Sequence, residues 1–254
     1  METPNIAGCS FDLSGRNVHV WPVRIDAPTA IAERFALYLG ADEKDRAARF
    51  QFDRLRYPFV IARGVLRILL GHYLNVSPGI LQFQYGSRGK PALAAPAWVD
   101  FNMSHSGGLA VCAFTAGCEV GVDVEHIRPL QDMQRIAERF FCSEEAQELM
   151  ALPANQRDHG FYLGWTRKEA YIKAIGDGLS APLNDFRVTL RPGQPARFVH
   201  IGNDPSSAEA WKLHDLELAP NYAAALAYRD TERPVVVLPI LDPAELLNQE
   251  QSNG

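Results

Sequence analysis

Two carboxylates in the segment 121–125 have the spacing of a metal or phosphate site. The segment reads GVDVE, and the alternation of a β-strand would place Asp123 and Glu125 together on one face. Two carboxylates a few ångströms apart repel each other unless a proton or a cation lies between them, and Mg²⁺ prefers oxygen ligands. The pattern predicts a hard-cation site, and the alternative is a pair of solvated acids at a strand end.

A third charged group for this site lies in the predicted helix 161–175. Glu169 and Lys173 are four residues apart, so they share one polar face of that helix. Phe161, Trp165 and Ile172 lie on an apolar stripe that would pack on the core. We predict that Glu169 completes the cation site. The alternative is an ordinary surface Glu–Lys pair worth about 0.3–0.5 kcal/mol.

The segment 101–108 reads FNMSHSGG and is predicted to be a polar loop before a strand. It suggests a serine hydrolase, but sequence neighbours point in different directions, so His105 is badly placed to take a proton from Ser104. No G-x-S-x-G elbow occurs in the chain. A hydroxyl, an imidazole and glycine amides in a tight turn resemble a cradle for phosphate oxygens, and the alternative is a self-bonded turn.

Basic residues upstream offer further positive charge for an anionic ligand. Lys90 lies between Gly89 and Pro91, where the spacing of a Walker phosphate loop fails but a fixed lysine can still meet a phosphate. A second cluster forms either an anion-binding rim or a solvated face, and it comprises Arg46, Arg49, Arg54 and Arg56.

The elements that must position these residues alternate between helices and strands. Predicted helices cover 29–39, 42–52, a stretch that starts near Pro58 and ends by Asn75 or Pro78, 136–141, 143–152 with Ser143 as cap, and 161–175. The longest one carries Arg63 and Arg67 on its polar face. Predicted strands cover 18–25, 109–114, 120–125, 186–190, 196–200, 211–218 and 222–228. A short turn at Gly117 would join the second and third of these strands.

This order of elements predicts an α+β protein with two subdomains. Residues 1–115 form the predicted N-terminal subdomain, 116–235 the C-terminal one, and 236–254 a C-terminal tail frayed from Gln249. Each half offers helices followed by strands, which permits a pseudo-symmetric pair.

Composition narrows the classes of function. With 254 residues, 47% of them hydrophobic, the chain can bury a large core, and its net charge of −5 argues against wrapping nucleic acid. No stretch approaches a membrane span or a signal peptide, so we expect a cytoplasmic protein that binds neither membranes nor nucleic acid. The four cysteines lack metal-site spacing and are expected to be reduced thiols.

Four motifs in order resemble the surfactin-type 4′-phosphopantetheinyl transferase family. They are GKP at 89–91, FNMSHS at 101–106, GVDVE at 121–125 and W-x-x-KEA-x-x-K at 165–173, followed by AIGDGL at 174–179. Each motif alone is ambiguous, whereas the joint match is specific. Outside 89–173, only the arginines from Arg46 to Arg67 are similar in type.

The resemblance implies a pseudo-dimer of two similar α/β subdomains with coenzyme A in the cleft between them. It implies Mg²⁺ on Asp123, Glu125 and Glu169. It also implies that coenzyme A is contacted by Arg46, Arg49, Lys90, Ser104, His105 and Lys173. At two positions where the family commonly has lysine, this chain has Arg46 and Glu43. The catalytic set would be Glu169, Lys173 and His105.

The implied reaction is that of a holo-[acyl-carrier-protein] synthase. A carrier serine attacks the β-phosphorus of coenzyme A, and 3′,5′-adenosine diphosphate leaves. Acyl, peptidyl and polyketide carrier proteins are the expected partners, and an internal pseudo-dimer makes a monomer the simplest quaternary state. Two alternatives remain open from the residues: a Mg²⁺-dependent pyrophosphate hydrolase, and a non-catalytic module that binds through the Arg46–Arg67 face.

Overall fold

The chain divides into two compact units, each with its own sheet and helices. The computed structural model describes residues 6, 8, 10–86, 89–95, 97–176, 182–202 and 205–253. Unit 1 comprises Met1–Gln84, Pro91–Gly117 and Val235–Gly254, and unit 2 comprises Tyr85–Lys90 and Cys118–Pro234.

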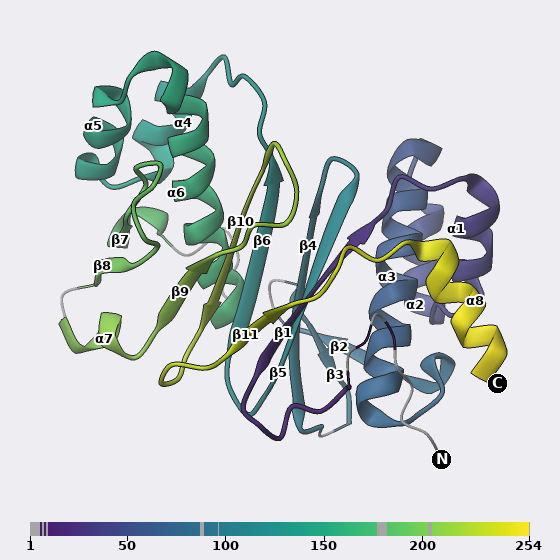
Figure 1. Cartoon of the computed structure of the whole chain (residues 1–254). Helices are drawn as coiled ribbons and strands as arrows, with labels where there is room; N and C mark the ends of the chain where they lie inside the picture. Colours follow the sequence, from purple (N-terminus) through teal and green to yellow (C-terminus); the bar gives the residue numbers. More distant parts are fainter. Residues whose placement is uncertain are drawn as a thin grey trace. The chain divides into compact units, whose positions relative to one another are not determined.

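Unit 1 is a four-stranded sheet with its helices gathered on one side (Figure 1). The strand order is β11-β1-β5-β4, in which β1 pairs with β11 in parallel and with β5 in antiparallel, and β5 pairs with β4. The elements are β1 (Val18–Arg24), α1 (Thr29–Ala36), α2 (Ala41–Ala48), α3 (Asp53–Leu74), the 3₁₀ turn η1 (Pro78–Ile80), β2 (Phe83–Tyr85), β3 (Pro91–Leu93), β4 (Val99–Ser106), β5 (Leu109–Ala116), β11 (Val235–Val237) and α8 (Pro243–Asn253).

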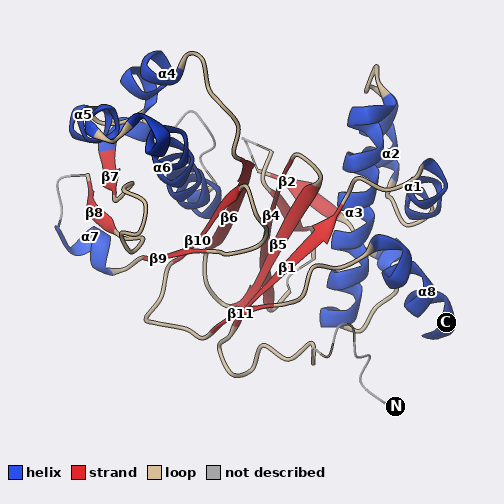
Figure 2. Cartoon of the chain, turned by 45° about the horizontal axis from the view of Figure 1, so that its top comes forward, coloured by secondary structure: helices blue, strands red, loops and turns tan. Residues whose placement is uncertain are grey.

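Unit 2 is a three-stranded sheet of order β6-β10-β9, and α6 lies directly against β6 and β10. Figure 2 shows α4 and α5 beside α6. The elements are β6 (Val120–His126), α4 (Met133–Phe140), α5 (Ser143–Ala151), α6 (Ala154–Ile175), η3 (Leu183–Asp185), β7 (Phe186–Val188), β8 (Phe198–Ile201), α7 (Pro205–Glu209), β9 (Lys212–Asp215) and β10 (Tyr222–Tyr228).

The two units repeat one topology. Each begins with a strand and three helices, of which the third has 22 residues, and continues with a 3₁₀ turn and a two-stranded sheet. In each unit two further strands then complete the order first-last-middle, β1-β5-β4 in unit 1 and β6-β10-β9 in unit 2, and unit 1 adds β11 and α8 to this repeat. The predicted α+β fold of two similar subdomains is confirmed.

The predicted turn between the strands at 109–114 and 120–125 does not make a hairpin. Both strands exist, as β5 and β6, but β5 pairs with β1 and β4, whereas β6 pairs with β10. Every strand of the repeat finds its partner inside its own unit. The short connection at Gly117, whose φ is 66°, is therefore a link between units rather than a β-turn within one sheet.

The longest helix of unit 1 differs from its prediction at its start and on its polar face. It begins at Asp53, so Pro58 lies inside the helix rather than in its first positions, and it ends as predicted at Asn75 in the left-handed conformation. Arg63 and Arg67 are buried rather than solvated. Glu43 on α2 accepts from both guanidiniums and offsets the cost of burying them.

The C-terminal residues form ordered elements of unit 1 instead of a tail. β11 extends the sheet beside β1, and α8 runs through Asn253, beyond the predicted fraying at Gln249. Leu246 and Leu247 of α8 are buried in the core of unit 1, and His72 of α3 pairs with Glu250. A three-residue strand and a helix with few buried positions leave a weak sequence signal, and both gain their stability from packing.

Cys112, Cys118 and Cys142 are free thiols, and Cys9 lies outside the described residues. Burial raises the pKa of Cys112 to about 12 and that of Cys142 to about 11. Cys142, not Ser143, is the N-cap of α5, because Glu145 at the third helical position accepts from its backbone N–H. Within the described part of the chain, no helix has the length and hydropathy to cross a membrane.

Candidate active site

Gly121 allows α6 to lie directly on β6. A Cβ atom at Gly121 would stand 2.1 Å from the carbonyl oxygen of Ala170 and 2.3 Å from the amide nitrogen of Ala174. Only a residue without a side chain fits under that helix. Because strand residues alternate, Asp123 and Glu125 share the face of Gly121, so they are directed toward α6.

Asp123 and Lys173 form the central contact between the two elements. Asp123 is 3% exposed, and the ammonium of Lys173 donates to its Oδ1 atom at 2.6 Å. Charge-assisted hydrogen bonds of this length are among the stronger polar contacts in proteins. The strand and the helix that were predicted to converge therefore do meet, and the contact is made by Asp123 and Lys173.

Glu169 lies one helical turn before Lys173 and is buried. Burial raises the pKa of Glu169 to about 7. The charges of Asp123 and Glu125 add to this rise, and Lys173 opposes it. Its Oε1 atom is buried and has no hydrogen-bond partner among the described residues. A buried carboxylate oxygen without a partner is rare because the loss of hydration is uncompensated, so this atom is available to a cation or a proton.

The three predicted metal ligands are near enough for the charges of Asp123 and Glu125 to act on Glu169, but they do not form a closed cage. Glu125 is half-buried near the end of β6, whereas Asp123 and Glu169 are buried. Within the described ranges, no group of three or more His, Cys, Asp or Glu side chains has the geometry of a metal site. The ammonium of Lys173 lies on Asp123, so a cation is already present at one of the three carboxylates. The donor set, all oxygen and rich in negative charge, fits a hard divalent cation in its chemistry.

Lys90 is held by the end of α6. Its ammonium donates to the carbonyl oxygens of Ala174, at 2.7 Å, and Val120, at 3.3 Å. A lysine at the last turn of a helix stabilises the exposed carbonyls and the negative end of the helix dipole.

The segment predicted as a polar loop is a strand through Ser106. β4 pairs with β5 along its whole length, and only the turn at Gly107, with φ at 59°, leaves the strand. A strand directs Ser104 and His105 to opposite faces, and Ser104 is buried while His105 is exposed. Alternation between apolar and polar residues is incomplete in this segment, which is why its composition resembled a loop.

The four arginines of the basic cluster lie along α2 and the start of α3. Arg46 and Arg49 are exposed at the C-terminal end of α2, with the guanidinium of Arg46 5.3 Å from the ring centroid of Phe59. Arg56 pairs with Asp53 at 2.7 Å. Arg54 lies over the ring of Phe52. These contacts leave an exposed basic rim on unit 1.

The first lysine of the W-x-x-KEA-x-x-K motif is structural. Lys168 is buried, pairs with Glu145 at 2.8 Å, and donates to the carbonyl oxygens of Leu183 and Phe186. Burial lowers the pKa of Lys168, and Glu145 opposes that shift. Sequence reasoning assigned no role to this pair. The sequence signal that could have found this pair is the position of Glu145, since an acid at the third position of a helix accepts a hydrogen bond from the backbone N–H of the N-cap residue.

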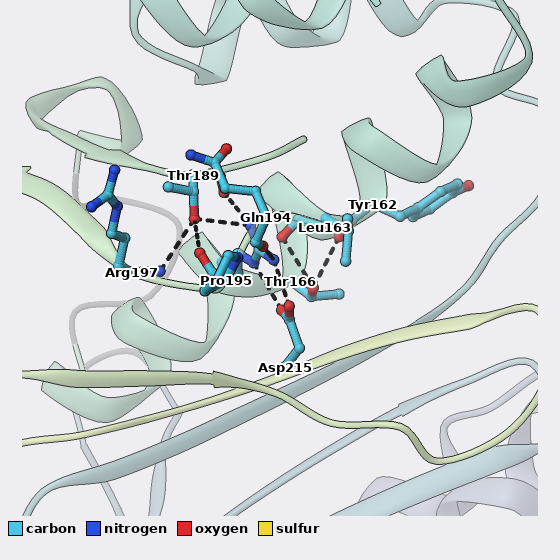
Figure 3. A network of polar contacts seen from close by, with 9 residues as sticks. Tyr162, Leu163, Thr166, Thr189, Gln194, Pro195, Arg197 and Asp215 are labelled. Atoms are coloured by element: carbon cyan, nitrogen blue, oxygen red, sulfur yellow. Dashed lines mark hydrogen bonds and ion pairs between the residues drawn. The ribbon is translucent and has the colours of Figure 1, made fainter. Parts of the chain in front are cut away.

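Arg167, the residue before Lys168, is a second buried cation that holds α6 in place. Its guanidinium binds both carboxylate oxygens of Asp215 on β9, at 2.8 and 2.5 Å, and donates to the carbonyl oxygens of Thr189 and Gln194. Figure 3 shows how Thr189, Gln194 and Asp215 converge on this network. The two buried cations Arg167 and Lys168 therefore hold α6 in place. Glu169 and Lys173, which follow them on the helix, lie toward β6.

Comparison with known proteins covers most of the chain. Residues 119–227 match the family model described as the 4′-phosphopantetheinyl transferase superfamily, and 28–116 match that of the 4′-phosphopantetheinyl transferase N-terminal region. The 4′-phosphopantetheinyl transferase HetI of Nostoc sp. is 41% identical over 86% of this chain and 90% of its own length. The 4′-phosphopantetheinyl transferase Sfp of Bacillus subtilis is 27% identical over 85% of this chain and 94% of its own.

The chain belongs to the 4′-phosphopantetheinyl transferase family, as the sequence motifs predicted. The predicted activity is confirmed at the level of this class of enzyme: coenzyme A-dependent transfer of 4′-phosphopantetheine to carrier proteins. Transfer is thereby favoured over the pyrophosphate hydrolase and the non-catalytic binding module.

Proposed function

We propose that Asp123, Glu125 and Glu169 hold the Mg²⁺ ion of this transferase. The observation that carries the proposal is the buried Oε1 atom of Glu169, which has no hydrogen-bond partner among the described residues and lies in the field of two further carboxylates. A bound Mg²⁺ would supply positive charge that neutralises the diphosphate of coenzyme A. Binding of a cation would also relieve the repulsion that raises the pKa of Glu169.

Lys173, His105 and Glu169 are the proposed catalytic residues. Lys173 would stabilise negative charge on the transferring phosphoryl group, and His105 would do the same for the 5′-phosphate of the leaving 3′,5′-adenosine diphosphate. Glu169 has a second proposed role as general base for the carrier serine, directly or through water. This role is an alternative to tight metal binding by the same carboxylate.

The remaining proposed contacts to coenzyme A come from Arg46, Arg49, Lys90 and Ser104, with His105 and Lys173 shared. Their support is the family match and their residue types, because phosphate oxygens prefer cations and hydroxyl donors. The ammonium of Lys90 already donates to carbonyl oxygens of Ala174 and Val120, and a phosphate would be a further acceptor for it.

Acyl, peptidyl and polyketide carrier proteins of fatty-acid, polyketide and nonribosomal peptide synthesis are the proposed acceptors. These carriers are acidic, so the exposed basic rim of unit 1 would steer their approach despite the net charge of −5. The second-order rate constant of transfer should then fall as salt is added, and a rate constant independent of salt would contradict the steering. We further propose a monomeric, cytoplasmic enzyme.

The test of the reaction is the intact mass of an apo carrier protein. The carrier is incubated with the enzyme, coenzyme A and Mg²⁺, and we expect a gain of one phosphopantetheine unit, which is lost when a chelator removes Mg²⁺. A hydrolase would instead cleave coenzyme A without a carrier. Unchanged carrier mass would refute the proposed reaction, and full transfer under chelation would refute the metal assignment alone.

A further inference from the structure

Lys173 forms an ion pair with Asp123, one of the proposed metal ligands. Its ammonium lies 2.6 Å from Oδ1 of Asp123, a carboxylate that is 3% exposed. The inference below rests on the proposed metal site, and it concerns what Lys173 does before the metal binds.

The ammonium of Lys173 offsets the cost of burying the Asp123 carboxylate, but Oδ2, the second oxygen of that carboxylate, is buried and has no hydrogen-bond partner among the described residues. A divalent cation that takes either oxygen as ligand would stand beside a positive charge in a region shielded from water. Repulsion between the two cations is strong there because the effective dielectric constant is low. Binding of the metal alone is therefore weakened unless the ammonium moves off Asp123.

Lys173 can make that movement at low cost. Its side chain is 28% exposed, against 4% for that of Asp123, and its flexible stem ends in three rotatable donors. Away from Asp123 the ammonium gains from any anion that it can reach in addition to Glu169, which lies one helical turn before it. A diphosphate that binds beside the metal would supply one, so the metal and the diphosphate each remove an obstacle to the other.

We propose that Lys173 is an internal counter-ion of Asp123 that competes with the divalent metal and thereby makes metal binding depend on the diphosphate of coenzyme A. The consequence is positive coupling between the two ligands, and linkage requires the coupling to be equal in both directions. Free enzyme would bind metal weakly, and the complete site would form only with its substrate.

The experiment measures binding rather than turnover. Mn²⁺ is titrated into the protein, with electron paramagnetic resonance reporting free Mn²⁺, first without and then with saturating coenzyme A. For Lys173→Gln, which keeps a hydrogen-bond donor for Asp123 but removes the charge, we expect affinity for Mn²⁺ alone to rise about tenfold or more over wild type. The enhancement of Mn²⁺ affinity by coenzyme A should shrink by a similar factor.

Matched variants separate charge from position. Lys173→Arg retains the competing cation and should bind Mn²⁺ alone as weakly as wild type. Arg229→Met removes a positive charge paired with the exposed Glu119 and should change nothing. Circular dichroism confirms that each variant is folded, and Lys173→Met provides a second uncharged variant if Lys173→Gln is not.

The outcomes distinguish the inference from the proposed function. If the uncharged variants bind Mn²⁺ no more tightly than wild type, or bind none, while Asp123→Asn loses binding that wild type has, the competition is wrong and the metal site stands. If Asp123→Asn binds Mn²⁺ as wild type does, the metal site itself is wrong, and the inference falls with it.

Discussion

The long helices of the two units pack on equivalent strands with opposite kinds of residues. In unit 1 the hydroxyl of Tyr73, the penultimate residue of α3, bonds to His19, the second residue of β1, at 2.7 Å. In unit 2 the same two positions hold Ala174 and Gly121, whose backbones nearly touch. Large side chains fill the space under α3, whereas the absence of side chains brings α6 down onto β6.

The fourth residue of each strand follows the same contrast. In β1 it is Trp21, which is fully buried and donates to Tyr73, and in β6 it is Asp123, which binds Lys173. A close helix lets the short acidic side chain of Asp123 reach a cation on that helix, while a distant helix needs aromatic side chains to exclude water. One repeated topology thus gives a packed core in unit 1 and a charged site in unit 2.

Both units nevertheless keep the same buried brace. A glutamate at the third position of the second helix, Glu43 or Glu145, caps that helix and pairs with a cation of the long helix, Arg67 or Lys168. Each cation donates to two backbone carbonyls after the long helix and lies over a phenylalanine ring of the next strand. The brace holds the scaffold in both units, and in unit 2 the same long helix also carries Lys173, which binds Asp123.

Breaking either brace should give the largest effect. Lys168→Met leaves Glu145 charged and buried, and Glu43→Gln leaves two buried guanidiniums without a counter-charge, so each should lower the free energy of unfolding by about 3–5 kcal/mol. Urea denaturation measures the loss, with the exposed Glu33→Gln as control. A loss below about 1 kcal/mol in both variants would show that neither brace supports its unit, and a large loss in only one would show that the braces are not equivalent.

Removing the charge of unit 2 should stop the reaction without unfolding the protein. Asp123→Ala is expected to lower the rate of transfer about 100-fold or more, which corresponds to about 2.7 kcal/mol of transition-state stabilisation. The carrier mass assay measures the rate, and Glu119→Ala, an exposed acid just before β6, is the control. Transfer at the wild-type rate would contradict the assignment of Asp123.

Adding one methyl group at the close approach should bring unit 2 nearer to the spacing of unit 1. Gly121→Ala forces α6 away from β6, and overpacking of this kind costs about 1–3 kcal/mol. We expect transfer to fall with stability because Lys173 and Glu169 move away from Asp123. Gly79→Ala, which meets nothing within 4 Å, is the control. Equal activity in the two variants would mean that close packing is not required.

The smallest expected effect is that of a residue in unit 1. His105→Ala should weaken coenzyme A binding about fivefold, or about 1 kcal/mol, and leave the Mg²⁺ concentration for half-maximal transfer unchanged. Calorimetric titration with coenzyme A measures the affinity, and the exposed His159→Ala is the control. Unchanged affinity would remove His105 from the proposed phosphate contacts and leave the chemistry to unit 2.

Strong local patterns were predicted correctly from the sequence. The alternation of residues 120–125 predicted β6 where it is observed. The apolar stripe of 161–175 and the glycine that follows it predicted the end of α6, because periodicity and capping are local properties. Segment 101–106 was misjudged, since its burial on both faces comes from neighbours in the sheet. α8 was missed because Leu246 and Leu247 find their partners far away in the chain.

The sequence by itself determined the family and the alternation that places Asp123 and Glu125 on one face, and it supplied the residues proposed for the site, because these depend on residue type and near neighbours. Only the tertiary structure decided that Lys168 is a brace, that Lys90 binds the end of α6 and that Lys173 lies on Asp123. Three lysines with the same chemistry differ in their surroundings, and the partner that each ammonium reaches is set by how closely a helix packs on a strand.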